Sequence, residues 1–317
     1  MLVLARGERF NANFFYNSGV DIDNSFFIKE GGERTLLVSK MNQDYAEERF
    51  KGGEVAVFRK DPFTELERIC RGRKIEMDFR GISARLYKEM CGFSKPQDVS
   101  EALSASRMKK SPGELLLMRQ AARASKSLLE AGKDSFGKTE MEFVFGLYIK
   151  TASKGFRPAF RPIVSSGKNT AFPHYEPGPE KISGTCLVDY GVSSQHYCAD
   201  ITRVFFQKPD PKKERIYRKL QHILEQLVER IPEFETGGAL ALHAEKLYRR
   251  EGLPLPPHTI GHGIGLEVHE LPSLSRKSGD PLEGATFTLE PSVYYPGEFG
   301  LRYEEVIHYN GKRAVIL

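Results

Sequence analysis

From residue 111 to the carboxyl terminus, one order of predicted elements occurs twice: two helices followed by strands. The predicted N-caps of the four helices are Ser111, Thr139, Asp210 and Thr236. The first two open capping boxes, SPGE and TEME, and Gly132 and Gly252 are predicted to stop the first and fourth helices. Strand-like runs follow each helix pair: CLVDYG and ITRVFF, then ATFTLE and YEEVIHY. This order predicts a duplicated α+β domain whose halves pack about a pseudo-twofold axis, share one central sheet and line one cleft.

The amino-terminal residues, 1–107, predict a separate and smaller α/β domain. Gly31 and Gly32 lie between two strand-like runs, SFFIKE and ERTLLVS, which predicts a hairpin. The strand-like segments EVAVF and KIEMDF follow, each succeeded by a predicted helix. The expected domains are therefore 1–107 and 108–317.

Composition narrows the class of protein. The formal net charge is +5, but 47 Lys and Arg residues are interleaved with 42 acidic residues, so no nucleic-acid partner is expected. The four cysteines form no C-x-x-C pair, which is typical of reduced thiols. No apolar run approaches the ~20 residues of a membrane span, and the start MLVLARGERF lacks the apolar region of a signal peptide. We expect a cytoplasmic protein that does not bind a membrane.

Two acidic residues lie where strands are expected to be buried. Asp189 is inside CLVDYG, and Asp200 follows eleven residues later in YCADITRVF. This separation lets the two carboxylates face each other on adjacent antiparallel strands joined by GVSSQHY. Like charges at close range repel, so the pair requires a cation or a shared proton.

Further acids occupy the second half of the predicted domain. Glu290 ends ATFTLEP, and Glu304 and Glu305 lie in LRYEEVIHY. Adjacent strand residues face opposite sides, so periodicity does not decide whether Glu304 or Glu305 points inward. Together with His262, which glycines flank in GHGIG, these oxygens predict a dinuclear site for a hard divalent ion such as Mn²⁺; one histidine is too few for a typical structural zinc site.

Other interpretations of the same residues are weaker. Each acid alone would more often be a surface or salt-bridged residue, and His174 or His269 alone would more often be structural. The GHGIG stretch could bind phosphate, but it has neither the G-x-G-x-x-G spacing nor the lysine of a P-loop. HELPS, which begins at His269, lacks the second histidine of an H-E-x-x-H zinc helix.

From Arg107 onward, five motifs in order resemble the pita-bread metallopeptidases, which include methionine aminopeptidases, aminopeptidase P and prolidase. The motifs are SGKNTAFPHY, VDYGVSSQHYCADITRVF, HTIGHGIGLEVHE, TFTLEP and GLRYEEVI. The resemblance implies a pita-bread fold and two divalent ions, Mn²⁺ or Co²⁺, with Zn²⁺ or Fe²⁺ as alternatives. It implies the metal ligands Asp189, Asp200, His262, Glu290 and Glu304, and so selects Glu304 over Glu305.

The resemblance also implies a mechanism, in which a hydroxide that bridges the metals attacks the scissile carbonyl. Glu290 is the candidate to shuttle the proton of the attacking water. His269 is expected to stabilise the developing oxyanion, and His174 to contact the substrate around the scissile amide. These three residues, His174, His269 and Glu290, are the expected catalytic residues.

The extra amino-terminal domain, which methionine aminopeptidases lack, favours the Xaa-Pro branch of the family. Creatinase shares the two-domain plan but lacks the metal ligands. The expected activity is hydrolysis of Xaa-Pro bonds in small peptides by a prolidase-like dipeptidase, with aminopeptidase P acting on longer peptides as the alternative, and a homodimer is expected.

Some prolidases have an arginine after the HExP turn, where this chain has Ser273, with Arg276 and Lys277 close behind. A non-catalytic relative that binds protein or nucleic acid is a third reading, which the complete ligand set disfavours.

Overall fold

The computed structural model describes residues 1–317, which divide into two compact units, Met1–Arg107 and Met108–Leu317. No helix has the length and apolarity needed to cross a membrane.

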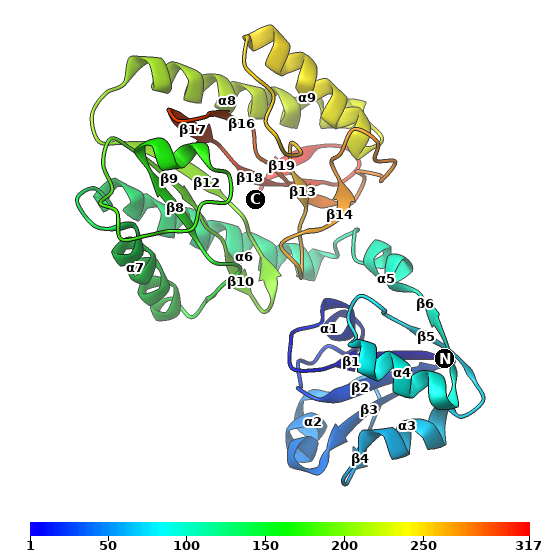
Figure 1. The fold of residues 1–317 in the computed structure, drawn as a ribbon. Coiled ribbons are helices and arrows are strands. Elements are labelled where there is room, and N and C mark those ends of the chain that lie inside the picture. Colours follow the sequence, from blue (N-terminus) through cyan, green and yellow to red (C-terminus); the bar gives the residue numbers. More distant parts are fainter. The chain divides into compact units, whose positions relative to one another are not determined.

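The first unit is built around a six-stranded mixed sheet with the order β4-β3-β2-β1-β5-β6 (Figure 1). Its strands are β1 (Leu2–Arg6), β2 (Ser25–Glu30), β3 (Glu33–Ser39), β4 (Glu54–Phe58), β5 (Lys74–Met77) and β6 (Lys95–Asp98). Its helices are α1 (Ala12–Ser18), the 3₁₀ turn η1 (Lys40–Asn42), α2 (Gln43–Arg49), α3 (Pro62–Cys70), α4 (Ala84–Phe93) and α5 (Ser100–Ser106). The predicted hairpin is confirmed, because β2 and β3 pair antiparallel up to Glu30 and Glu33.

Side-chain alternation along β2 shows that both faces of this sheet are covered. Phe26 and Ile28 belong to one apolar cluster, whereas Phe27 between them belongs to another. Helices α3 and α4 contribute Leu66 and Met90 to the first cluster. This period of two is that of a strand buried on both sides.

The second unit begins with two helices and contains thirteen strands. Its helices are α6 (Pro112–Leu129), α7 (Glu140–Ser153), α8 (Pro211–Arg230) and α9 (Gly237–Glu251), with 3₁₀ turns η2 (Glu130–Asp134), η3 (Gly167–Ala171) and η4 (Ile231–Glu233). Strands of its first half are β7 (Arg157–Pro158), β8 (Ile163–Ser166), β9 (Thr185–Asp189), β10 (Val192–Ser194), β11 (Tyr197–Cys198) and β12 (Thr202–Phe206). Strands of its second half are β13 (His262–Gly263), β14 (Glu270–Ser273), β15 (Thr286–Leu289), β16 (Ser292–Tyr295), β17 (Phe299–Arg302), β18 (Glu305–Tyr309) and β19 (Ala314–Ile316).

The repeated order of two helices followed by strands is therefore observed, and in Figure 1 the strands of this unit lie between α6 and α7 on one side and α8 and α9 on the other. Both capping boxes form, at Ser111 with Glu114 and at Thr139 with Glu142. On α8 a buried stripe with helical spacing packs into the main apolar cluster: Leu220, Ile223, Leu224 and Leu227.

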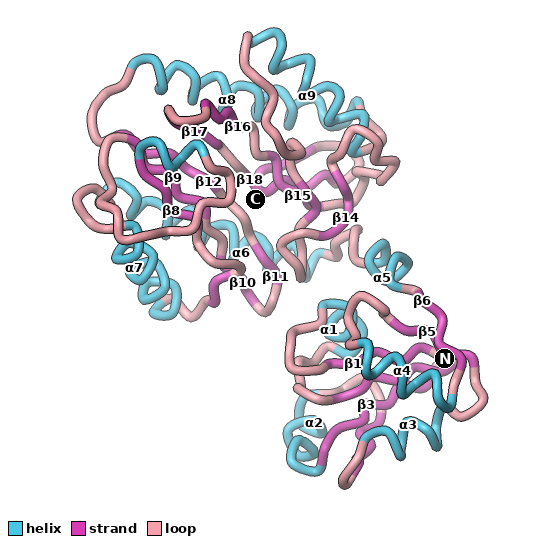
Figure 2. Tube along the Cα trace, viewed as in Figure 1, coloured by secondary structure: helices cyan, strands magenta, loops and turns pink.

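Two expectations about this unit are wrong in detail. The halves do not share one hydrogen-bonded sheet, because β12-β9-β8 and β14-β13-β15-β18-β19 form separate sheets (Figure 2), although Glu304 donates its backbone N–H to the Thr202 carbonyl oxygen at 3.3 Å. Gly132 does not cap α6, which ends at Leu129. A Cβ on Gly132 would lie 2.1 Å from the Phe205 ring, so this glycine allows close packing. Gly252, in contrast, is the left-handed C-cap of α9, with φ of 66°.

Candidate metal centre

A cavity of about 690 Å³ in the second unit gathers all seven residues that the sequence singled out. Side chains from both halves line it, including Asp189, Asp200, His262, Glu290, Glu304, His174 and His269. Four of these are acids, Asp189, Asp200, Glu290 and Glu304, and we call them the acid cluster. The cavity thus combines segments more than 100 residues apart in the chain.

The acids lie at strand ends, where the chain leaves its hydrogen-bonded ladder. Asp189 is the last residue of β9, Glu290 directly follows β15, and Glu304 lies in the two-residue break between β17 and β18. Asp200 precedes β12 by two residues. It does not face Asp189 directly, because Thr202 is the partner of Asp189 in the ladder.

The strands beside Asp189 and Asp200, β9 and β12, pair antiparallel as expected, but the link between them is more than a turn. The intervening residues form a hairpin, β10 and β11, which pairs with β7 in a separate three-stranded sheet. Gly191 permits the crossing of the two chain segments, since a Cβ there would lie 1.7 Å from the Ala199 carbonyl oxygen. The aspartates still meet, because both segments return to the same end of the β9–β12 pair.

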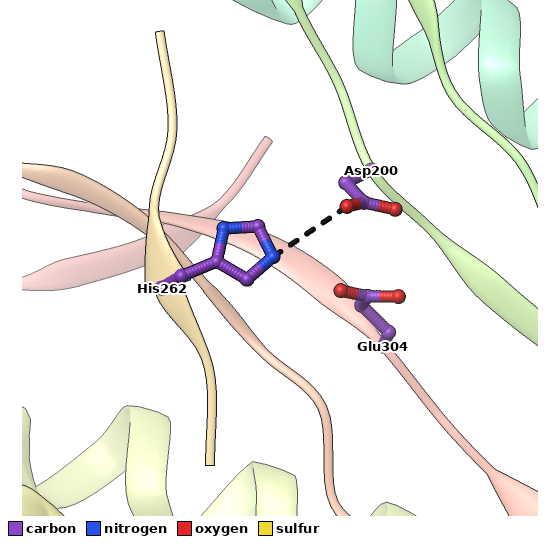
Figure 3. A group of neighbouring side chains, drawn as sticks. All are labelled: Asp200, His262 and Glu304. Atoms are coloured by element: carbon purple, nitrogen blue, oxygen red, sulfur yellow. Dashed lines mark ion pairs between the residues drawn. The ribbon is translucent and has the colours of Figure 1, made fainter. Parts of the chain in front are cut away.

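The glycines beside His262 allow neighbouring backbone segments to approach closely. A Cβ on Gly261 would lie 2.0 Å from the Thr288 carbonyl oxygen, and one on Gly263 would lie 2.2 Å from the Leu271 carbonyl carbon. Strand β13 is therefore pressed between β14 and β15, with which it pairs. This packing directs the His262 ring at the acid cluster, as Figure 3 shows.

Three potential ligands converge from three segments of the chain. Figure 3 shows Asp200, His262 and Glu304, whose ligand atoms all lie within 4.8 Å of one another. The Nε2 atom of His262 lies 3.5 Å from Asp200 Oδ2. Its Nδ1 lies 3.1 Å from the Gly263 carbonyl oxygen, an arrangement that places the proton on Nδ1 and leaves the Nε2 lone pair directed at the carboxylates.

The acid cluster has one protein cation in contact with it. The guanidinium of Arg302 donates to Asp189 Oδ2 at 2.6 Å. The Oδ1 atoms of Asp189 and Asp200 are buried and accept no hydrogen bond. These two buried acceptors have no donor from the protein, so they are suited to a cation that the protein itself does not provide.

The pKa values of the cavity residues reflect the same excess of acids over protein cations. Burial and the neighbouring acids raise the pKa values of Asp200 and Glu304 well above their usual range. Burial, opposed by Arg302 and reinforced by Asp189, raises the pKa of Glu290 to about 8. Burial and the adjacent His269 lower the pKa of His262 to about 4, which keeps its imidazole neutral. A neutral imidazole among oxygen donors fits a divalent ion such as Mn²⁺, Co²⁺, Fe²⁺ or Zn²⁺.

The two histidines expected to be catalytic also lie on the cavity. His269 packs its ring against that of His262, with ring centroids 4.1 Å apart. Burial and the charge of nearby His174 lower the pKa of His269. His174 lies on the exposed part of the cavity wall, between η3 and β9.

Two further residues of this site were missed by sequence reasoning. His258 lies 3.6 Å from Glu290 through Nδ1, and its Nε2 lies 3.1 Å from the Tyr294 hydroxyl. Arg302 is 3% exposed and also contacts Thr202 Oγ1, at 2.9 Å, and the Tyr294 hydroxyl, at 2.8 Å. The available signals were a third histidine in the same glycine-rich stretch and an arginine inside the β-forming run FGLRYEEV.

The adjacent glutamates, Glu304 and Glu305, are both buried but differ in surroundings. Glu304 lines the cavity and accepts a hydrogen bond from Thr202 Oγ1 at 2.7 Å. Glu305 points away from it, pairs with Arg203 and lies 3.0 Å from Lys126 Nζ. Strand periodicity left open which of these two glutamates points into the site, and in the structure it is Glu304 that lines the cavity.

Comparison with known proteins places these observations in a family. The sequence pattern of Metallopeptidase family M24 matches residues 116–310. An uncharacterized peptidase of Methanocaldococcus jannaschii is 33% identical over 284 residues, covering 86% of this chain and 78% of its own length. An Xaa-Pro dipeptidase of Pyrococcus furiosus is 28% identical over 304 residues, covering 93% of this chain and 87% of its own.

Solved structures agree with the sequence comparison. Prolidase from Pyrococcus furiosus superimposes with a TM-score of 0.89 at 25% identity, covering 99% of this chain and 95% of its own. X-Pro aminopeptidase from Thermotoga maritima gives 0.90 at 25% identity, covering 99% and 94%. The predicted α+β pita-bread fold is confirmed by these matches. The chain belongs to metallopeptidase family M24.

Proposed function

We propose that this metallopeptidase hydrolyses the peptide bond before proline in small peptides, as a prolidase-like Xaa-Pro dipeptidase. The observation that carries the proposal is the convergence of the acid cluster, His262, His174 and His269 on one cavity of an M24 chain. The relative from Pyrococcus furiosus, named an Xaa-Pro dipeptidase, supports the choice of substrate. The similarity to a prolidase structure over 99% of this chain supports assigning residues 1–107 to a prolidase-like amino-terminal domain.

We propose that two divalent ions, Mn²⁺ or Co²⁺ before Zn²⁺ or Fe²⁺, are held by Asp189, Asp200, His262, Glu290 and Glu304. The orphaned buried oxygens of Asp189 and Asp200 and the neutral imidazole of His262 fit such ions. When bound, a pair of ions lowers the pKa of water to supply the nucleophile and polarises the scissile carbonyl. The number of ions is supported by the number of acids, since a single divalent ion would leave much of their charge uncompensated.

The side chains around the ligands have separate tasks in this proposal. Glu290, on the cavity wall and 3.6 Å from His258, would take the proton of the attacking water and deliver it to the leaving nitrogen. That delivery matters for proline, whose imide nitrogen carries no hydrogen before cleavage. His269 would donate a hydrogen bond to the developing oxyanion, and His174 would contact the substrate beside the scissile bond.

The cavity also offers an apolar wall that suits a proline ring. Its apolar lining residues are Phe160, Pro162, Ile163, Pro173, Pro177 and Val268. Burying a ring of this size against apolar groups contributes on the order of 1–2 kcal/mol. This surface supports a preference for proline over a polar residue at the product side.

The experiment that tests the proposed function is hydrolysis of a small panel of Xaa-Pro dipeptides by metal-reconstituted protein. Cleavage that requires Mn²⁺ or Co²⁺ and is lost in Asp200→Asn is the expected result. The absence of cleavage with every divalent ion, in protein shown to be folded, would reject a peptidase of this specificity.

The second candidate is an Xaa-Pro aminopeptidase that acts on longer peptides. Its supporting observation is the Thermotoga maritima structure, which is as similar to this chain as the prolidase structure. Tripeptides of the form Xaa-Pro-Yaa separate the two, because equal or faster cleavage of tripeptides would favour the aminopeptidase. The homodimer and the cytoplasmic location stay predictions, and a non-catalytic binding role would be favoured only if the protein bound no metal.

A further inference from the structure

Two cationic side chains, Arg161 and Arg302, line the catalytic cavity. Arg302 is fully engaged by the protein: Asp189 accepts from Nη2, Thr202 from Nε and Tyr294 from Nη1. Its guanidinium is buried, and rearranging it would leave those groups without their donor. Arg302 is therefore a structural partner of the acid cluster.

Arg161 has the opposite character. Its side chain is 59% exposed and pairs with Glu176, whose side chain is 71% exposed and also lines the cavity. Exposed ion pairs contribute little to stability, so an incoming anion can displace Glu176 from the guanidinium at small cost. Arg161 is thus available to a ligand in the cavity.

The position of Arg161 places it beside the metal ligands. It precedes β8 by two residues, and Ile163, the first residue of β8, is the ladder partner of Asp189. Paired Cα atoms are about 5 Å apart, and two more residues add at most about 7 Å. The Arg161 Cα therefore lies within about 12 Å of that of Asp189, a span that a long arginine side chain and a dipeptide can bridge.

The cations near Ser273 are directed elsewhere. Arg276 pairs with Glu245 of α9, and together with Lys277 it lines a neighbouring cavity of about 500 Å³. Ser273 itself donates to Ser275 Oγ at 3.2 Å and has no charge to offer. Neither Arg276 nor Lys277 lines the catalytic cavity, so neither is placed to substitute there for the arginine that some prolidases have at position 273.

We propose that Arg161 binds the carboxylate of the proline residue in an Xaa-Pro dipeptide, and so selects dipeptides over longer peptides. This inference rests on the proposed function. An arginine fork can donate two parallel hydrogen bonds to one carboxylate, which gives both affinity and orientation. In a dipeptide that carboxylate is one residue from the scissile bond, whereas in a tripeptide it lies a residue further away.

The loop that carries Glu176 is anchored, so the contact with Arg161 has a defined place. Buried Glu140 accepts a hydrogen bond from the Gly178 backbone N–H at 3.0 Å. Asn169 donates to the Tyr175 hydroxyl at 2.9 Å. Glu176 therefore acts as a fixed competitor that holds the guanidinium until a substrate carboxylate arrives.

The test compares Ala-Pro with its amide, Ala-Pro-NH₂, which has the same scissile bond but no carboxylate. In metal-reconstituted Arg161→Ala, KM for Ala-Pro is expected to rise about 10- to 100-fold, with kcat and the amide little changed. Arg161→Lys should recover part of the loss, and Arg276→Ala, the matched control, should leave both substrates unchanged. Glu176→Gln, which removes the competitor, should lower KM for Ala-Pro a few-fold, and it tests the idea even if Arg161→Ala fails to fold.

Several results would overturn the assignment of Arg161. These are equal cleavage of acid and amide by the unmodified enzyme, parallel loss of both substrates in Arg161→Ala, or a selective loss in Arg276→Ala instead. In all three cases Xaa-Pro cleavage persists in the unmodified enzyme, so the proposed function survives. Failure of the unmodified, metal-loaded enzyme to cleave any proline peptide would instead overturn the proposed function, and the Arg161 inference with it.

Discussion

Glu304 and Glu305 are adjacent in the chain but belong to two different buried acidic regions. Glu304 is part of the acid cluster, whereas Glu305 lies among ion pairs. Glu305 has two cationic partners, Arg203 and Lys126, and accepts a hydrogen bond from the Tyr303 hydroxyl at 3.2 Å. The acid cluster has four carboxylates and, in contact with them, the guanidinium of Arg302. Burial of acids alone therefore does not mark a metal site. What distinguishes the proposed metal site is the deficit of protein cations around its carboxylates.

The largest expected effect that separates the two regions is on catalysis. Glu304→Gln should lower kcat/KM for an Xaa-Pro dipeptide by about 1000-fold or more, because it removes a proposed metal ligand at the reacting centre. Glu305→Gln, the matched neighbour, should keep kcat/KM within a few-fold in protein that remains folded. Steady-state kinetics with saturating Mn²⁺ measures both, and comparable activity of the two variants would contradict the distinction.

The free energy of unfolding should respond in the reverse order, with the larger loss in Glu305→Gln. Glu305→Gln should lower the free energy of unfolding by about 2–4 kcal/mol, because it leaves the half-buried Arg203 guanidinium without its charged partner. In metal-free protein, Glu304→Gln should cost nothing or be stabilising, since glutamine resembles the uncharged form that burial and the neighbouring acids favour at this position. Urea unfolding in the presence of a chelator measures both. A larger loss in Glu304→Gln would show that the acid cluster is already compensated by the protein.

Removing the metal should lower the free energy of unfolding of the second unit. Each ion present at 100 times its dissociation constant adds about 2.7 kcal/mol to the free energy of unfolding, so chelation should produce a marked loss. Asp200→Asn should show a much smaller response to the same chelator. Thermal unfolding with and without Mn²⁺ tests this, and an identical response of both proteins would argue against Asp200 as a ligand.

The smallest effect concerns pH between 6.5 and 8 in metal-free protein. The pKa of Glu290 is about 8 in the folded chain against an ordinary value of 4.5, so the folded state holds a proton that the unfolded state releases. Stability should therefore fall as pH rises from 4.5 to 8, by up to about 1.4 kcal/mol per pH unit.

Two histidines have the opposite effect on stability over the lower part of this pH range. The pKa values of His258 and His262 are lowered to about 4, so their contribution to stability grows between pH 4 and 6.5 and is constant above. The fall should thus be clearest between pH 6.5 and 8, and Mn²⁺ should suppress it. Urea unfolding at several pH values provides the measurement, and a rise in stability over that interval would contradict the assigned burial of Glu290.

The residues of this site were predictable to different degrees. Asp189 and Glu290 could be singled out because a carboxylate within or beside an apolar strand needs a partner, and their strands form as expected. The choice between Glu304 and Glu305 required the family resemblance, since the chain breaks from β17 to β18 at that point and strand parity does not apply across a break.

Other features were beyond local sequence patterns. The hairpin of β10 and β11 inserts into a different sheet, and nothing in GVSSQHY indicates which edge it will join. Arginine is usually exposed, so nothing in the sequence alone placed Arg302 in the site; its burial follows from partners contributed by distant segments, Asp189 and Thr202. Such long-range charge pairing is decided only when both halves of the domain are folded.

The proposed two-ion site is best tested by calorimetric titration of metal-free protein with Mn²⁺ in two buffers of different ionisation enthalpy. Two ions should bind per chain, and protons should be released as the raised pKa values of Glu290, Asp200 and Glu304 fall on binding. Asp200→Asn should bind fewer ions or bind them far more weakly. Absence of binding at millimolar Mn²⁺, or equal binding by Asp200→Asn, would contradict the proposed site.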